Sequence, residues 1–142
     1  MYHPESRKII DELNGQISSL KGGIFAKLGN VELMISSKDG IGGFIEEWFG
    51  AWSKENGFNV QKQHNAQIFP DYFVGGNGLL EIKTFDKQAG PAFDIANFES
   101  YCESAANTPS RVESDYLIFS YLSINGELSI KDIWLKKIWE IS

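Results

Sequence analysis

Residues 70–85 read PDYFVGGNGLLEIKTF and decide how the middle of this chain folds. Two runs rich in aromatic and branched side chains, residues 68–74 and 79–85, flank a glycine-rich cluster at 75–78. Runs of this kind separated by a short glycine turn are typical of a β-hairpin. We therefore expect two antiparallel strands joined by a tight loop.

The length of that loop sets the register of the hairpin. If residues 75–77 form a three-residue loop, antiparallel pairing sets Asp71 against Glu81. Directly opposed residues share a face and lie about 5 Å apart, and Lys83, two positions after Glu81, points to the same face. A two-residue loop would instead place Asp71 opposite a leucine. The three-residue loop predicts two carboxylates and one ammonium group on one surface.

Two carboxylates at this distance repel each other unless a cation lies between them. Mg²⁺ is a suitable cation, because it prefers oxygen and usually takes one or two carboxylates together with water and substrate phosphate. The backbone carbonyl of Ile82 is a further candidate ligand. The metal would polarise a phosphodiester and activate water, while Lys83 positions that water or stabilises the developing charge. Asp71, Glu81 and Lys83 are therefore the candidate catalytic residues, although such a pattern also occurs by chance in roughly one chain in twenty.

Helices are expected on the N-terminal side of the hairpin. Residues 5–20 place apolar side chains at helical spacing, and residues 41–52 repeat that spacing in one broad stripe before Gly57 ends the second helix. Residues 24–33 fit a short helix or a strand equally well.

On the C-terminal side of the hairpin, the sequence predicts one more helix and two more strands. Pro91 and Asp94 begin a helix that the residues around Pro109 end. Residues 116–124 and 127–133 read as strands, and Asn125-Gly126 between them is a strong hairpin signal. The order of elements predicts an α/β fold with a mixed β-sheet flanked by helices.

Composition limits the class of protein. A chain of 142 residues with 42% hydrophobic content is the size of one domain, and Cys102 as the only cysteine excludes an internal disulfide and favours a cytoplasmic protein. Residues 1–20 resemble neither a signal peptide nor a membrane span. The net charge of −6 argues against a basic surface for nucleic acid. The chain ends in the apolar run 138–142 without a helix stop, so we expect a single catalytic domain over residues 1–142 that is truncated at the C-terminus.

The motifs also resemble a known group of enzymes. Pro70-Asp71 and Glu81-Ile82-Lys83, after a helix with the sequence GGFIE at 42–46, are similar to the PD-(D/E)XK nuclease superfamily in motif and element order. From about Gly22 onward the chain resembles type II restriction endonucleases of the NgoBV family, in the segments GGIF at 22–25, LEIKTFD at 80–86 and PAFDIANFESY at 91–101.

This resemblance implies a restriction-endonuclease-like core, Mg²⁺, and cleavage of double-stranded DNA at a short palindrome, GGNNCC in that family. A two-fold symmetric target implies a homodimer. Carried over, Asp71 and Glu81 are metal ligands and Lys83 is the catalytic lysine. Glu46 corresponds to a helix glutamate that completes the metal site, although Glu46 and Glu47 flank the apolar stripe about equally and either fits a solvated helix face.

Two other functions stay open on the sequence. A nuclease that recognises DNA structure in repair or recombination would use the same metal site, because specificity lies in surfaces that the motif does not describe. An α/β interaction module without catalysis would carry the same fold. The identity of the residues that read DNA is not predicted.

Overall fold

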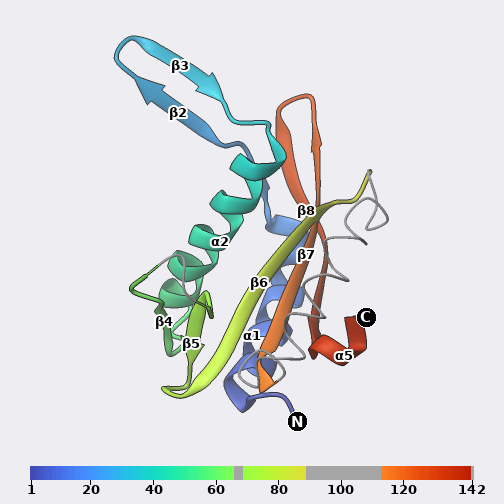
Figure 1. Ribbon diagram of the computed structural model, residues 1–142. Coiled ribbons are helices and arrows are strands. Elements are labelled where there is room, and N and C mark those ends of the chain that lie inside the picture. Colours follow the sequence, from blue (N-terminus) through green and yellow to red (C-terminus); the bar gives the residue numbers. More distant parts are fainter. Residues whose placement is uncertain (66–68, 89–112, 142) are drawn as a thin grey trace.

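The structure is a computed structural model that describes residues 1–65, 69–88 and 113–141. Figure 1 shows a twisted sheet with two long helices, and the N- and C-termini lie at the same end of the molecule. The elements are α1 (Pro4–Gln16), a 3₁₀ turn (Ile17–Ser19), β1 (Lys21–Gly22), β2 (Phe25–Leu28), β3 (Val31–Met34), α2 (Lys38–Glu55), β4 (Val60–Lys62), β5 (Tyr72–Val74), β6 (Gly78–Asp86), β7 (Asp115–Ile124), β8 (Glu127–Lys136) and α5 (Ile138–Ile141).

Six of the strands form one sheet in the order β1-β8-β7-β6-β5-β4. Its pairs are antiparallel except for β6 with β7, which run parallel. The predicted mixed sheet and α/β class are confirmed. A parallel pair needs a long crossover connection; this one passes through residues 89–112, so the helix predicted after Pro91 lies outside the described residues.

The central hairpin has the predicted loop and register. Gly75 and Gly76 adopt positive φ angles of 59° and 91°, a conformation that glycine adopts without steric cost. Val74 pairs with Gly78 and Tyr72 with Leu80. The three-residue loop is therefore confirmed. Asp71 is the residue directly before β5 and lies beside Glu81 of β6.

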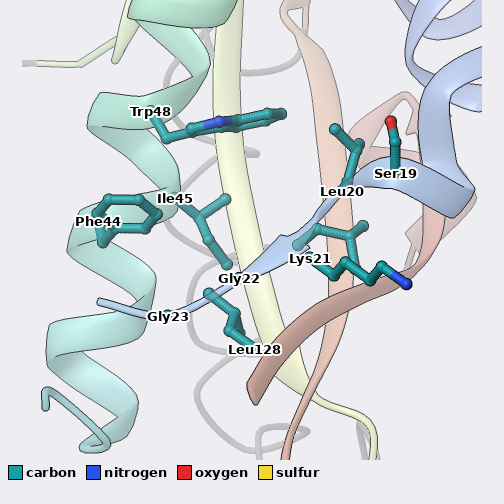
Figure 2. A pocket seen from close by; sticks show the side chains of 10 residues that line it. Ser19, Leu20, Lys21, Gly22, Gly23, Phe44, Ile45, Trp48 and Leu128 are labelled. Atoms are coloured by element: carbon teal, nitrogen blue, oxygen red, sulfur yellow. The ribbon is translucent and has the colours of Figure 1, made fainter. Parts of the chain in front are cut away.

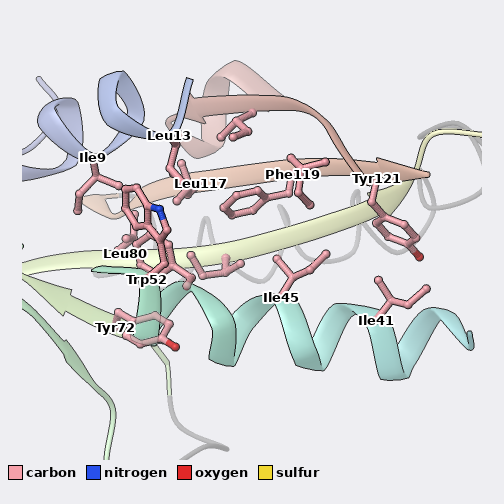
Figure 3. Close-up of a cluster of buried hydrophobic side chains, with 14 of the residues drawn as sticks. Ile9, Leu13, Ile41, Ile45, Trp52, Tyr72, Leu80, Leu117, Phe119 and Tyr121 are labelled. Carbon is pink, nitrogen blue, oxygen red and sulfur yellow. The ribbon is translucent and has the colours of Figure 1, made fainter. Parts of the chain in front are cut away.

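The core lies between the sheet and the two helices (Figure 3). Most of the stripe predicted for residues 41–52 is buried on α2, with Ile45 and Phe49 among its most buried side chains, whereas Phe44 is 39% exposed. The helix α1 adds Ile9 and Leu13. Both helices therefore supply side chains to one core. In the described part of the chain no helix is long and apolar enough to cross a membrane.

Two glycines let α2 lie close to the sheet. A Cβ at Gly42 would come within 3.0 Å of Oγ1 of Thr84, and a Cβ at Gly50 within 2.8 Å of the hydroxyl of Tyr72. Larger side chains at these helix positions would push α2 away from β5 and β6. Tyr72 also donates a hydrogen bond from its hydroxyl to the backbone carbonyl of Glu46. These contacts set both the height and the rotation of α2 over the strands that carry the predicted site.

A buried ion pair joins the start of β7 to the residue that follows β8. The ammonium group of Lys137 lies 2.7 Å from Oδ1 of Asp115, and both side chains are buried. The other oxygen of Asp115 accepts the backbone N–H of His3 at 3.0 Å, directly before α1. This arrangement ties the first helix to the start of β7 and the end of β8.

Candidate active site

Asp71 and Glu81 lie side by side, and the carboxylate of each accepts a hydrogen bond from a backbone N–H at or next to the other residue. Oε1 of Glu81 accepts the backbone N–H of Asp71 at 3.1 Å, and Oδ2 of Asp71 accepts the backbone N–H of Ile82 at 2.8 Å. One oxygen of each carboxylate is therefore held by a backbone hydrogen bond. These bonds fix the orientation of both side chains before any ligand binds.

Lys83 extends the group along β6. Its ammonium nitrogen lies 4.0 Å from Oε2 of Glu81. The side chain of Lys83 is 31% exposed, whereas that of Glu81 is 9% exposed. The predicted carboxylates and the predicted lysine are thus brought together by the alternation of the strand. The lysine is the more accessible of the two residues on β6.

Glu46 approaches from α2. Its carboxyl group lies beside that of Asp71, and the two groups share a hydrogen bond when Glu46 carries a proton. Burial, followed by the charge of Asp71 and that shared hydrogen bond, raises the pKa of Glu46 to about 7, against smaller opposing effects of Lys62 and Lys83. The raised pKa is the result expected when carboxylates gather without a cation to separate them.

Glu47 takes a different direction from Glu46. Its carboxylate lies 3.3 Å from the ammonium nitrogen of Lys62, and its side chain is 74% exposed. Of the two glutamates, Glu46 is the one that approaches Asp71. An exposed pair such as Glu47 with Lys62 contributes little to stability.

Tyr72 supports the position of Glu46 from β5, a role that the sequence did not indicate. It is fully buried, and its hydroxyl donates a hydrogen bond to the backbone carbonyl of Glu46. Burial, followed by the charge of Glu46, raises the pKa of Tyr72 to about 12. A glycine in the interior of a predicted helix, Gly50, is the signal in the sequence that could have indicated this close approach.

The donors at this place fit Mg²⁺. Asp71, Glu81 and the carbonyl oxygen of Ile82 are hard oxygen ligands, and a site with one or two carboxylates is usual for Mg²⁺, which keeps water and phosphate as its other ligands. Glu46 and Asp71 lie within electrostatic reach of each other and of Lys62 and Lys83, and Glu81 lies beside Asp71. Within residues 1–65, 69–88 and 113–141 no three His, Cys, Asp or Glu side chains are arranged to bind one metal ion. The donors that the structure places together here are the carboxylates of Asp71 and Glu81.

The family of this chain follows from sequence comparison. Residues 3–142 match the family described as NgoBV restriction endonuclease. The chain belongs to this family. The resemblance predicted from the motifs is thereby confirmed for nearly the whole sequence.

Individual relatives agree with that membership. The chain is 39% identical over 140 residues to the type II restriction enzyme NlaIV of Neisseria lactamica, which covers 95% of this chain and 57% of the relative. It is 35% identical over 139 residues to the type II restriction enzyme NgoBV of Neisseria gonorrhoeae, covering 95% of this chain and 78% of the relative. The chain thus spans little more than half the length of the first of these relatives.

A solved structure supports the fold. The structure of the NlaIV restriction endonuclease matches this one with a TM-score of 0.72 and 37% sequence identity, over 94% of this chain and 57% of that chain. The predicted restriction-endonuclease-like core is confirmed by this match.

Proposed function

We propose that this chain is the catalytic domain, over residues 1–142, of a Mg²⁺-dependent type II restriction endonuclease. It hydrolyses phosphodiester bonds of double-stranded DNA at a short palindrome, with GGNNCC as the expected target, and acts in the cytoplasm as a homodimer. Family membership supports the class of enzyme. The observation that carries the mechanism is the pair Asp71 and Glu81, held in place by hydrogen bonds between their strands, with Lys83 beside it.

Each residue has a distinct part in this proposal. Asp71, Glu81 and the carbonyl of Ile82 hold the metal, which when bound polarises the scissile phosphate and lowers the pKa of water. Lys83 orients the attacking water and stabilises negative charge on the phosphate oxygens. Glu46, which approaches Asp71 from α2, completes the metal site as a further carboxylate ligand, and the interaction between its carboxyl group and that of Asp71 supports this part.

The proposal is tested by metal titration combined with DNA cleavage. Calorimetry with MgCl₂ or MnCl₂ on the wild type, Asp71→Ala and Glu81→Ala should show binding in the wild type and at least tenfold weaker binding in both variants, since each removes a charged ligand. Asp11→Ala, which removes an exposed carboxylate on α1, is the matched control and should bind as the wild type does.

The same proteins are then incubated with two plasmids, one carrying GGNNCC sites and one without them. Discrete fragments from the wild type, ending at those sites, support the proposal. If the wild type binds no metal more tightly than the two variants and leaves both plasmids intact, the proposed function is wrong. Cleavage of branched DNA in preference to either duplex would favour the repair or recombination nuclease instead.

A further inference from the structure

The hairpin formed by β2 and β3, residues 25–34, stands apart from the main sheet. It pairs with no other strand of the described chain, and every residue of both strands is exposed. Figure 1 shows this hairpin, here called the arm, projecting beyond the N-terminal end of α2. A two-stranded hairpin with water on both faces is marginally stable at best, so the arm is expected to be covered in the functional state.

The two faces of the arm differ in chemistry. Directly paired residues share a face. Ala26 pairs with Leu33, and Leu28 with Val31, so these four side chains form one face without a polar group. Lys27 pairs with Glu32 on the other face. The first set, Ala26, Leu28, Val31 and Leu33, is called the apolar arm face.

The exposure of this face is unusual for a monomer. Leu28 at the tip is 88% exposed and Val31 is 64% exposed. Leu33 is also exposed, so the apolar arm face offers on the order of 300 Å² of apolar surface, comparable to the largest patch of a typical monomer and often a mark of an interaction site. Phe25 and Met34 are exposed on the other face, with Lys27 and Glu32. A stable interface buries roughly 800 Å² on each partner, so two arms in contact would supply part of that area.

A pocket at the base of the arm complements its tip. The pocket has a volume of about 230 Å³ and lies between α2 and the strands β1 and β8 (Figure 2). Its lining includes Gly22 and Gly23, which lead into β2, and the apolar side chains of Phe44 and Trp48 on α2. The ring of Phe44 is itself partly exposed. The pocket therefore has the size and lining for an aliphatic side chain such as leucine.

A second copy of this chain fits these features better than DNA does. Two arms packed antiparallel about a two-fold axis bring the tip of each to the base of the other, where the pocket lies. The apolar arm face is uncharged, so it can meet itself without like-charge repulsion, although each chain carries a net charge of −6. DNA would require basic or hydrogen-bonding groups, and Lys27 on the other face is balanced by Glu32.

We propose that the arm is the dimerisation element: the apolar arm face packs against the same face of a second copy, and Leu28 of each chain enters the pocket beside Phe44 of the other. This inference rests on the homodimer of the proposed function and adds the surface that forms it. The contact is isologous, so it closes at two copies.

The test measures the dimer dissociation constant of the full chain by sedimentation equilibrium. Leu28→Asp and Lys27→Asp place the same carboxylate at neighbouring exposed positions on opposite faces of the arm. Leu28→Asp should raise the dissociation constant by at least about 100-fold, because it buries an unpaired charge in each half of the interface. Lys27→Asp should change it by less than about threefold. Phe44→Asp, at the pocket, should act as Leu28→Asp does, with thermal unfolding of each variant showing that the fold is retained.

The inference is overturned if the wild type is monomeric at 100 µM, or if Leu28→Asp and Lys27→Asp have equal effects. Metal titration and plasmid cleavage on the same samples separate this inference from the proposed function. A dimer that depends on Leu28 in a protein that neither binds metal nor cuts DNA would leave the arm inference standing and the function wrong. A protein that cuts DNA while its association is insensitive to Leu28→Asp would do the reverse.

Discussion

The backbone nitrogen of Asp71 lies 3.1 Å from Oε1 of Glu81 and donates a hydrogen bond to it. The carboxylate of Glu81 is therefore held by the backbone of the residue that carries the other carboxylate. With the bond from Ile82 to Oδ2 of Asp71, Asp71, the residue directly before β5, is held to β6 at two points. Groups held on rigid elements keep their geometry when a neighbouring side chain is changed. Substitutions around the pair should therefore report on chemistry rather than on unfolding.

Lys83→Ala should abolish most of the cleavage activity while leaving metal binding nearly unchanged. The lysine lies beside Glu81 but supplies no metal ligand in the proposed site, and loss of one charge-stabilising group typically lowers kcat by about 10²–10³-fold. Single-turnover cleavage at saturating Mg²⁺ measures the effect. Lys131→Ala, an exposed lysine on β8, is the control. Equal rates for the two variants would contradict the assigned part of Lys83.

Glu46→Gln and Glu47→Gln form a second matched pair. Glu46 reaches Asp71, whereas Glu47 pairs with Lys62 at the surface. We expect Glu46→Gln to weaken Mg²⁺ binding by about tenfold, because it removes the charge of one proposed carboxylate ligand, and Glu47→Gln to have no effect. Calorimetric titration of both variants measures this difference. Weaker binding in Glu47→Gln alone would reverse the assignment.

Gly50→Ala and Gly43→Ala should change stability in opposite directions. Both glycines lie in α2, where alanine is ordinarily better by about 0.5–1 kcal/mol. A Cβ at Gly43 meets nothing within 4 Å, but at Gly50 it would come within 2.8 Å of the hydroxyl of Tyr72. We therefore expect Gly43→Ala to stabilise and Gly50→Ala to destabilise by about 1–3 kcal/mol, measured by urea denaturation. Stabilisation by both would show that α2 can shift away from β5.

Stability should fall as the pH rises from 10 to 12, in part because of Tyr2. Burial, followed by a hydrogen bond to Glu140, raises the pKa of Tyr2 from 10.0 to about 12. The folded protein keeps this proton in that range while the unfolded chain loses it, so the contribution is complete below pH 10 and is lost as the pH passes 12. The free energy of unfolding, followed by urea denaturation across this range, should decline less steeply in Tyr2→Phe. An identical slope in both proteins would count against the assignment.

Much of the fold could be predicted from local patterns. The register of the central hairpin follows from its loop length, because side chains alternate strictly along a strand and a shift of one residue would reverse every face. The turn at Asn125 and Gly126, both with positive φ, was predicted for the same kind of local reason. Residues 24–33 were ambiguous, since their structure as the arm depends on pairing between strands that no local periodicity distinguishes from a short helix.

The sequence by itself determined that side chains alternate along the central hairpin, so that a three-residue loop brings Asp71, Glu81 and Lys83 to one face, and the structure has that loop. Only the tertiary structure decided between Glu46 and Glu47, which flank the apolar stripe of α2 about equally. That choice depends on the rotation of the helix over the sheet, which is set by Gly42 against Thr84 and by Gly50 against Tyr72. Contacts between elements distant in the chain produce no repeating pattern in the sequence, so they cannot be predicted from local periodicity. They follow only from the packing of the helix on the sheet.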